Sequence, residues 1–195
     1  MKYRKDLDFD EFIGQHILLY GDTNTNKTYL TAKFIRFLLE SENLTPKDIS
    51  ILDFAPKLTI INNLKIGGKI QDFYENSKKC NNIKFQGEII PPRLTSSNIN
   101  DLYLKAYKNF MKTSAILQIF KDNPSPILII NDISIHLHLG SIKLLLEIIS
   151  KADTFFGNSY YGSSIKRDFA TRFSLLEKRK VEYLIKKLDK SCFTG

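Results

Sequence analysis

The feature that most constrains this chain is a polar run, residues 21–28 with the sequence Gly-Asp-Thr-Asn-Thr-Asn-Lys-Thr, placed between two apolar segments. The mostly apolar segment 16–20 precedes the run directly and predicts a buried strand over residues 16–21. After the run, apolar residues recur at helical spacing, which predicts a helix over residues 27–42. Gly21 has no Cβ, so the chain can turn sharply out of the strand at that point. The sequence therefore predicts a strand, a tight loop and a helix.

The loop opens on Gly21 and closes on Lys27 and Thr28, and it resembles the P-loop, or Walker A motif, of the P-loop NTPase superfamily. The resemblance implies that the loop N–H groups and the helix N-terminus surround the β-phosphate of a nucleotide. It also implies that Lys27 is the catalytic cation at the β- and γ-phosphates and that Thr28 ligates Mg²⁺. The nucleotide-binding residues that it implies are Gly21, Asp22, Thr23, Asn24, Thr25, Asn26, Lys27, Thr28 and Tyr29.

Asn26 departs from the motif, because it stands where the second glycine is usual. Asparagine adopts left-handed backbone angles more readily than other non-glycine residues, so we expect the loop to form. The Asn26 side chain is expected to occupy space where the phosphates approach.

A second apolar run, residues 126–130, is followed by Asn131 and Asp132 and predicts a strand buried on both faces. This segment looks like a Walker B strand. The resemblance implies that Asp132 holds Mg²⁺ through water, opposite Thr28. Ile133 stands where many ATP-driven motors carry the glutamate that activates the attacking water. The source of that activation is therefore open.

Three residues are candidates for a role at the γ-phosphate. Asp53 lies at the end of a predicted strand, residues 49–54, whose tip should share the ligand-binding edge of the sheet, although Asp53 fits equally well as a turn residue. Arg93 is predicted either to place its guanidinium near the γ-phosphate or to pair with a carboxylate on the surface. Asn158 is predicted to end a fourth strand, residues 152–158, and either to contact the nucleotide or to open an ordinary loop.

The order of elements predicts an α/β protein in which a mostly parallel sheet is flanked by helices, and the resemblance implies the three-layer fold of P-loop NTPases. Further helices are expected over residues 99–120 and 141–151. A length of 195 residues predicts a single domain, 1–195. Residues 57–97 are too long for a plain connection and are expected to form a lid or a substrate-binding insertion. His136 and His138 lie on one side of the chain if segment 133–139 is extended, where a structural or substrate-loop role is favoured over metal binding.

The net charge of +8 is concentrated near the C-terminus. Residues 164–190 combine an apolar stripe with many lysines and arginines, which predicts a basic amphipathic helical segment. Its basic face is either simply solvated or a binding site for nucleic acid or another polyanion. No stretch reaches the length of a membrane span and the N-terminus lacks the apolar core of a signal peptide, so we expect a cytoplasmic protein without a membrane partner.

Three functions remain open at this stage. The first is an Mg-ATP-binding P-loop protein that acts as a slow ATP hydrolase or a nucleotide switch. The second is a small-molecule or nucleotide kinase, in which Asp53 is the base and residues 57–97 and 133–139 form the acceptor pocket. The third is a non-catalytic nucleotide-binding module that associates with nucleic acid. ATP is favoured because the guanine-reading Asn-Lys-x-Asp pattern is absent, and GTP stays open.

Overall fold

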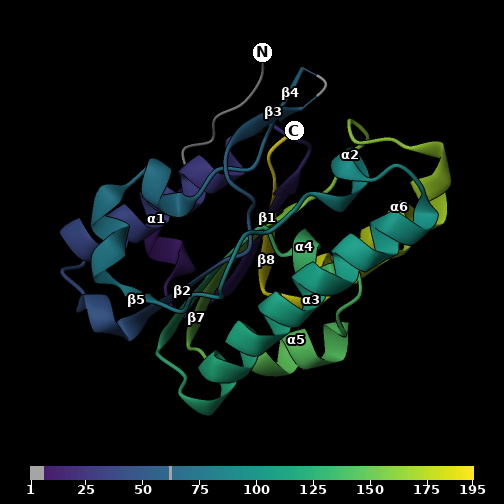
Figure 1. Cartoon of the computed structure of the whole chain (residues 1–195). Helices are drawn as coiled ribbons and strands as arrows, with labels where there is room; N and C mark the ends of the chain where they lie inside the picture. The colour runs from purple at the N-terminus through teal and green to yellow at the C-terminus, as the bar shows by residue number, and fades with distance from the viewer. Residues whose placement is uncertain (1–6, 62) are drawn as a thin grey trace.

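The structure is a computed structural model and describes residues 7–61 and 63–195. Within these residues, its centre is a six-stranded sheet in the order β5-β2-β6-β7-β1-β8, with parallel pairing throughout (Figure 1). The strands of this sheet are β1 (His16–Gly21), β2 (Ile49–Asp53), β5 (Asn81–Asn82), β6 (Ile127–Asn131), β7 (Thr154–Tyr160) and β8 (Lys190–Phe193). The helices are α1 (Lys27–Glu40), α2 (Pro92–Thr95), α3 (Ile99–Asp122), α4 (Ser134–Leu137), α5 (Ile142–Ile149) and α6 (Thr171–Lys187).

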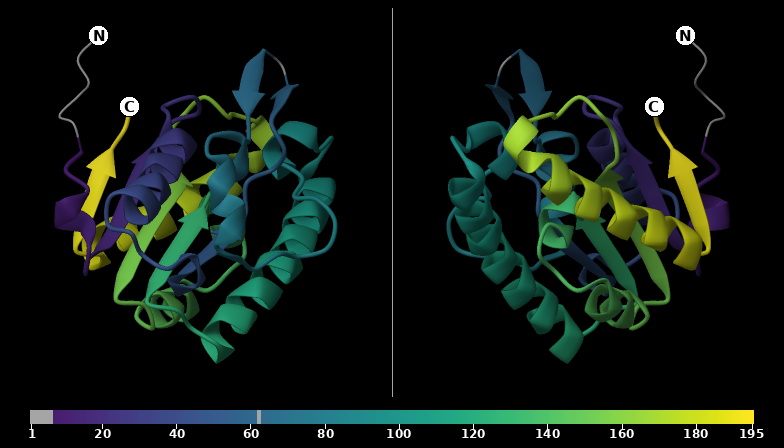
Figure 2. Two further views of the ribbon diagram at one scale, coloured as in Figure 1. Left: turned by 90° about the vertical axis from the view of Figure 1, so that its left-hand side faces the viewer. Right: turned by 90° about the vertical axis from the view of Figure 1, so that its right-hand side faces the viewer.

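Helices cover both faces of the sheet and make three layers (Figure 2). One face is covered by α1 and by short 3-10 turns within residues 70–79. The other face is covered by α3, α4, α5 and α6. The α/β class with a mostly parallel sheet between helices is therefore confirmed, and the loop of residues 22–26 does connect a strand to a helix.

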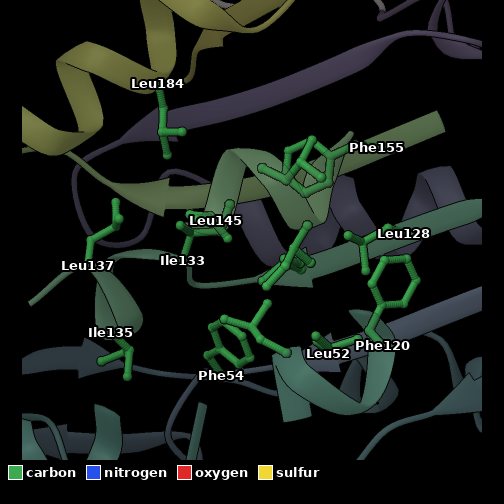
Figure 3. Packing of buried hydrophobic residues seen from close by; sticks show 14 of the residues in the cluster. Leu52, Phe54, Phe120, Leu128, Ile133, Ile135, Leu137, Leu145, Phe155 and Leu184 are labelled. Atoms are coloured by element: carbon green, nitrogen blue, oxygen red, sulfur yellow. The ribbon is translucent and has the colours of Figure 1, made fainter. Parts of the chain in front are cut away.

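The sheet interior explains why these segments form strands. Every residue of β6 is buried, as expected for a parallel strand with helices on both sides. On the face covered by α3, Phe54, Leu128 and Phe155 belong to one core cluster together with Phe120 of α3 and Leu184 of α6 (Figure 3). Burial of apolar area stabilises the fold by about 25 cal/mol per Å², so this continuous core holds the strand tips in fixed positions.

The predicted boundary of the fourth strand was wrong. The strand β7 runs through Tyr160, and Asn158 pairs in register with Leu19 of β1. Asn158 is therefore a buried strand residue and does not open a loop. The sequence also gave no sign of β8, which follows α6 and pairs in parallel with β1. Because of β8, residues 194 and 195 lie beside the polar loop of residues 21–28.

Segments 57–97 and 133–139 both contain regular secondary structure. Residues 57–97 include the antiparallel hairpin of β3 (Thr59–Ile61) and β4 (Leu64–Ile66), and β5 and α2. Segment 133–139 is not extended, because α4 forms there. His136 is fully buried, its Nδ1 lies 2.9 Å from the Thr113 hydroxyl, and burial lowers its pKa to about 4. A neutral, structural imidazole at His136 follows from these contacts.

The described residues contain no helix with the length and apolar character that crossing a membrane would require.

Candidate functional site

A cleft of about 470 Å³ opens at the edge of the sheet where the parallel strands end. Ligands of open α/β sheets bind at this edge, and the volume suits a small molecule. Most of the residues predicted from the sequence line it: Thr23, Asn24, Thr25, Asn26, Lys27, Thr28, Tyr29, Arg93, Asp132 and Asn158. Gly21, Asp22 and Asp53 are not part of its lining.

The polar loop has the left-handed residues that a tight strand-to-helix turn requires. Asn24 has φ 59° and Asn26 has φ 61°. Asn26 is the N-cap of α1, and Leu30 donates its backbone N–H to the Asn26 carbonyl at 2.9 Å. Asn26 therefore takes a left-handed conformation, which glycine adopts without strain and asparagine adopts at a modest steric cost.

The Lys27 ammonium lies inside the loop. It donates to the carbonyl of Gly21 at 3.0 Å, to the hydroxyl of Thr25 at 3.1 Å and also to the carbonyl of Asp22. Burial lowers the pKa of Lys27 to about 8, against the opposing attraction of the Asp132 and Asp22 carboxylates. The loop thus holds a cation at the cleft through its own oxygen atoms, and a cation in such a position can form charge-assisted hydrogen bonds with a phosphate.

Asp22 connects the polar loop to the loop that follows β7. Its carboxylate accepts hydrogen bonds from the backbone N–H groups of Thr23 at 2.7 Å, Ser163 at 3.0 Å and Ser164 at 3.1 Å. Burial alone would raise the pKa of Asp22, but these hydrogen bonds hold it below its usual value. A Cβ on Gly162 would come within 2.3 Å of this carboxylate, so a side chain at position 162 would displace the Asp22 carboxylate from these hydrogen bonds.

Asn131, which the sequence analysis did not single out, is the centre of a buried hydrogen-bond network next to the cleft. It is fully buried at the end of β6, and its Oδ1 accepts from the Thr28 hydroxyl at 3.2 Å and from Asn158 Nδ2 at 2.8 Å. Its Nδ2 donates to Asp53 Oδ1 at 2.9 Å and to the Gly68 carbonyl at 3.2 Å. One amide therefore joins α1, the tips of β2, β6 and β7, and the segment after β4.

Asp132 lies just beyond the strand, with φ 58°. Its Oδ1 accepts from the Ser134 hydroxyl at 2.6 Å, and its backbone N–H donates to Asn158 Oδ1 at 3.0 Å. Burial raises the pKa of Asp132, while Ser134 and the Lys27 charge act in the opposite direction. The residue that meets the Thr28 hydroxyl is Asn131, and Asp132 faces the cleft next to it.

Asp53 is held by structural contacts. Its oxygens accept from the backbone N–H groups of Ala55 at 3.1 Å and Ile70 at 2.8 Å, in addition to Asn131. Lys69 Nζ lies 3.6 Å from Asp53 Oδ1. Burial raises the pKa of Asp53 despite these partners. Asp53 therefore lies at the predicted edge of the sheet, with its carboxylate turned to the segment after β4.

Arg93 lines the cleft and forms a buried ion pair. Its Nη1 lies 3.0 Å from Glu177 Oε2 of α6, its Nη2 donates to Glu177 Oε1 at 3.2 Å, and its guanidinium lies 4.7 Å from the centre of the Tyr160 ring. Burial would raise the pKa of Glu177, but the charges of Arg93 and His138 hold it below its usual value. Of the two alternatives predicted for Arg93, the carboxylate partner exists, and it is buried instead of exposed.

The signals that could have found the missed residues are weak. Asn131 is the single polar residue ending an apolar run, but its neighbour Asp132 has the more familiar chemistry. Glu177 is one of two acidic residues in a charged helix, so its burial could not be recognised from the sequence.

No protein-family model matches the chain, and no curated protein matches it either. Among solved structures, the chain is similar to the flagellar accessory protein FlaH from Methanocaldococcus jannaschii, with 12% identical residues and a TM-score of 0.39. The similarity covers 89% of this chain and 75% of the FlaH chain. The functional conclusion therefore depends on the geometry of the cleft.

Proposed function

We propose that this chain binds Mg-ATP in the cleft and acts as a slow ATP hydrolase or a nucleotide switch. The observation that carries the proposal is the Lys27 ammonium enclosed by the strand-to-helix loop at the carboxyl edge of the sheet. A phosphate would take over the ammonium from the loop oxygens and accept from the loop N–H groups and the α1 N-terminus.

The residues around Thr28 fit Mg²⁺. The Thr28 hydroxyl and the Asp132 carboxylate are hard oxygen donors of the kind that Mg²⁺ binds, and both line the cleft, whereas Asn131 is buried outside the lining and accepts from the Thr28 hydroxyl. Bound Mg²⁺ would neutralise charge on the nucleotide phosphates. Thr28 and Asp132 are proposed as the metal-side residues, with Asn131 positioning Thr28.

Slow turnover is proposed because the groups that would activate water are engaged elsewhere. The Asp53 carboxylate is hydrogen-bonded to Ala55, Ile70 and Asn131, and Arg93 is paired with Glu177. Asp132 is then the carboxylate that faces the cleft. Proposed catalytic roles of Asp53 and Arg93 would require these contacts to open.

The test is a titration of the protein with a fluorescent ATP analogue and Mg²⁺, using Lys27→Ala and the exposed Lys47→Ala as a charge-matched control. Loss of the Lys27 charge is expected to weaken binding about 10-fold to 100-fold, because a hydrogen bond to a charged group contributes about 1.5–3 kcal/mol. Lys47→Ala is expected to bind as the native protein does. Equal affinity of the native protein and Lys27→Ala would show that the loop is not the nucleotide site.

A kinase remains the second candidate, because one end of the cleft is apolar. Leu58, Ile66, Phe73 and Tyr29 line this end, and the Tyr29 and Phe73 rings meet edge to face at 6.2 Å. Exposed apolar side chains in a cleft suit an acceptor molecule next to the γ-phosphate. Release of phosphate from ATP without any acceptor favours the hydrolase, whereas ATP consumption that depends on an added nucleoside favours the kinase. Tight Mg-ATP binding without either reaction indicates the non-catalytic module.

A further inference from the structure

A second groove, of about 360 Å³, lies on the other side of a wall shared with the nucleotide cleft. The wall consists of Arg93, Tyr160 and Ile165, which line both spaces. The rest of the groove is formed by the loop after β7 and by the first two turns of α6, and Figure 2 shows this loop directly above the start of α6. The hydrolase and the kinase proposed above do not use this groove.

The charges lining the groove favour an anionic ligand. The ion pair of Arg93 and Glu177 is internally neutral. The other charged side chains in the lining are Lys166, Arg167 and Lys178 against Asp168, which leaves three cations and one carboxylate. A concave surface with excess positive charge raises the local concentration of anions.

Aromatic side chains accompany these cations. Lys178 Nζ lies 5.0 Å from the centre of the Tyr161 ring, and the Tyr161 hydroxyl donates to Glu182 at 3.0 Å, which fixes the ring. The Tyr160 ring forms part of the shared wall. A groove that combines cations with aromatic rings is the surface on which single-stranded nucleic acids bind, with phosphates on the cations and bases stacked on the rings.

Hydrogen bonds connect the groove with the polar loop of the nucleotide cleft. Asp22 accepts from Ser163 and Ser164, so the residues at the groove's edge are attached to the loop that encloses Lys27. On the other side, Arg93 joins Tyr160 to Glu177 of α6, and Arg167 Nε donates to the Arg93 carbonyl at 3.3 Å. A movement of the loop when a phosphate binds would therefore change the shape of the groove.

We propose that this groove binds single-stranded nucleic acid and that occupancy of the nucleotide cleft changes the affinity. Lys166, Arg167 and Lys178 contact successive phosphates, and a base stacks on Tyr161 in the place that Lys178 occupies. The dependence on nucleotide rests on the proposed function, whereas binding of the oligonucleotide itself does not. Since coupling between two sites is reciprocal, the oligonucleotide changes the affinity for ATP by the same factor.

A duplex and an acidic polypeptide fit the groove less well. The bases of a duplex are stacked inside and cannot reach the Tyr161 ring, and an acidic polypeptide offers carboxylates without flat bases. These two ligands are therefore the competitors in the test.

The test measures fluorescence anisotropy of a short labelled oligothymidylate, with a duplex of the same length and polyglutamate as competitors. The Lys166→Glu/Lys178→Glu variant is compared with Lys186→Glu/Lys187→Glu, which makes the same charge change at exposed positions of α6 outside the groove. Three phosphate contacts predict a slope of log affinity against log salt of about −2. The groove variant is expected to lose about 10-fold or more in affinity and to flatten the slope by about 1.4 units, while the control changes little.

Equal losses in the two variants, competition by polyglutamate or duplex as strong as by unlabelled oligothymidylate, or an absence of binding would each overturn the proposal. Coupling is tested by repeating the titration with Mg²⁺ and a non-hydrolysable ATP analogue, whose own binding is measured separately. If the analogue binds and the oligonucleotide affinity does not change, the coupling is refuted and the proposed function is intact. If the analogue does not bind but the groove variant still loses affinity, the proposed function fails and the nucleic-acid site stands.

Discussion

The buried amide of Asn131 allows the most quantitative prediction, because its replacement by alanine removes four hydrogen bonds at once. The Thr28 hydroxyl is half-buried and can turn to water, and Asp53 Oδ1 keeps the Ala55 N–H. One N–H of Asn158 and the Gly68 carbonyl lose their partner. A buried polar group without a partner costs about 1–3 kcal/mol, so Asn131→Ala is expected to lower the free energy of unfolding by about 4 kcal/mol.

The assay is urea unfolding followed by circular dichroism, together with thermal melting. For a domain of this length, about 4 kcal/mol corresponds to a decrease in Tm of roughly 8–16 °C. The exposed Asn100→Ala in α3 is the control and is expected to change stability by less than about 0.5 kcal/mol. A loss below about 1 kcal/mol for Asn131→Ala would refute the conclusion that this amide holds the strand tips together.

A double-mutant cycle separates the role of the Asn131–Asn158 hydrogen bond from the general cost of truncation. The two amides are directly bonded at 2.8 Å, so the losses caused by Asn131→Ala and Asn158→Ala are expected to be non-additive by about 1 kcal/mol. Additive losses would mean that the two side chains stabilise the edge independently. The same variants are also expected to bind nucleotide more weakly, because Thr28 loses the group that orients it.

Three further predictions concern the residues around the cleft. Lys27 has a pKa of about 8, so the affinity for nucleotide should be full below pH 8 and fall above it. The lysine pKa in the unfolded chain is higher, so the free energy of unfolding of the free protein should rise as the pH increases above 8. Lys27→Arg should abolish both trends in calorimetric titrations. Asn26→Gly removes a left-handed asparagine and its side chain, and should tighten ATP binding up to about 5-fold in the fluorescence titration, corresponding to ~1 kcal/mol; unchanged or weaker binding would mean that the asparagine takes part in the site. Arg93→Met removes the Arg93 partner of the buried Glu177 and should lower the free energy of unfolding in urea by about 3–5 kcal/mol. The double variant Arg93→Met/Glu177→Leu should recover most of this loss. If Arg93→Met alone were as stable as the native protein, the result would contradict the buried ion pair.

The parts of the fold that the sequence predicted are those with a strong local pattern. Strands β1 and β6 have short, mostly apolar runs, and helix α1 has apolar residues at helical spacing. A short apolar run of this kind is typical of a buried parallel strand. Strand β8 was missed because Lys190–Phe193 contains few apolar residues, and this segment forms a strand through pairing with β1. Long-range pairing of this type leaves little trace in a local pattern.

The candidate site divides in the same way. The residues of the polar loop 21–28 could be placed in the site because the loop directly connects a predicted strand to a predicted helix. Asn131 and Glu177 could not be recognised, because their roles come from partners distant in the sequence: Thr28 lies 103 residues before Asn131, and Arg93 lies 84 residues before Glu177. The roles of such residues depend on their burial and on their hydrogen-bond or ion-pair partners, and the neighbouring residues in the sequence predict neither.

The neutral amide of Asn131 also affects how a metal would reach the site. The side chain that accepts from the Thr28 hydroxyl carries no charge. Burial raises the pKa of the nearby Asp132 carboxylate, and the charge of Lys27 acts in the opposite direction. A divalent cation prefers several charged oxygens, and here most of that charge would have to come from the nucleotide phosphates. Mg²⁺ is therefore expected to enter as the Mg-nucleotide complex. Asn131→Asp, in contrast, would place a second carboxylate 2.9 Å from Asp53 Oδ1, where two like charges cannot both ionise, so a gain in metal affinity at this position would come with a loss of stability.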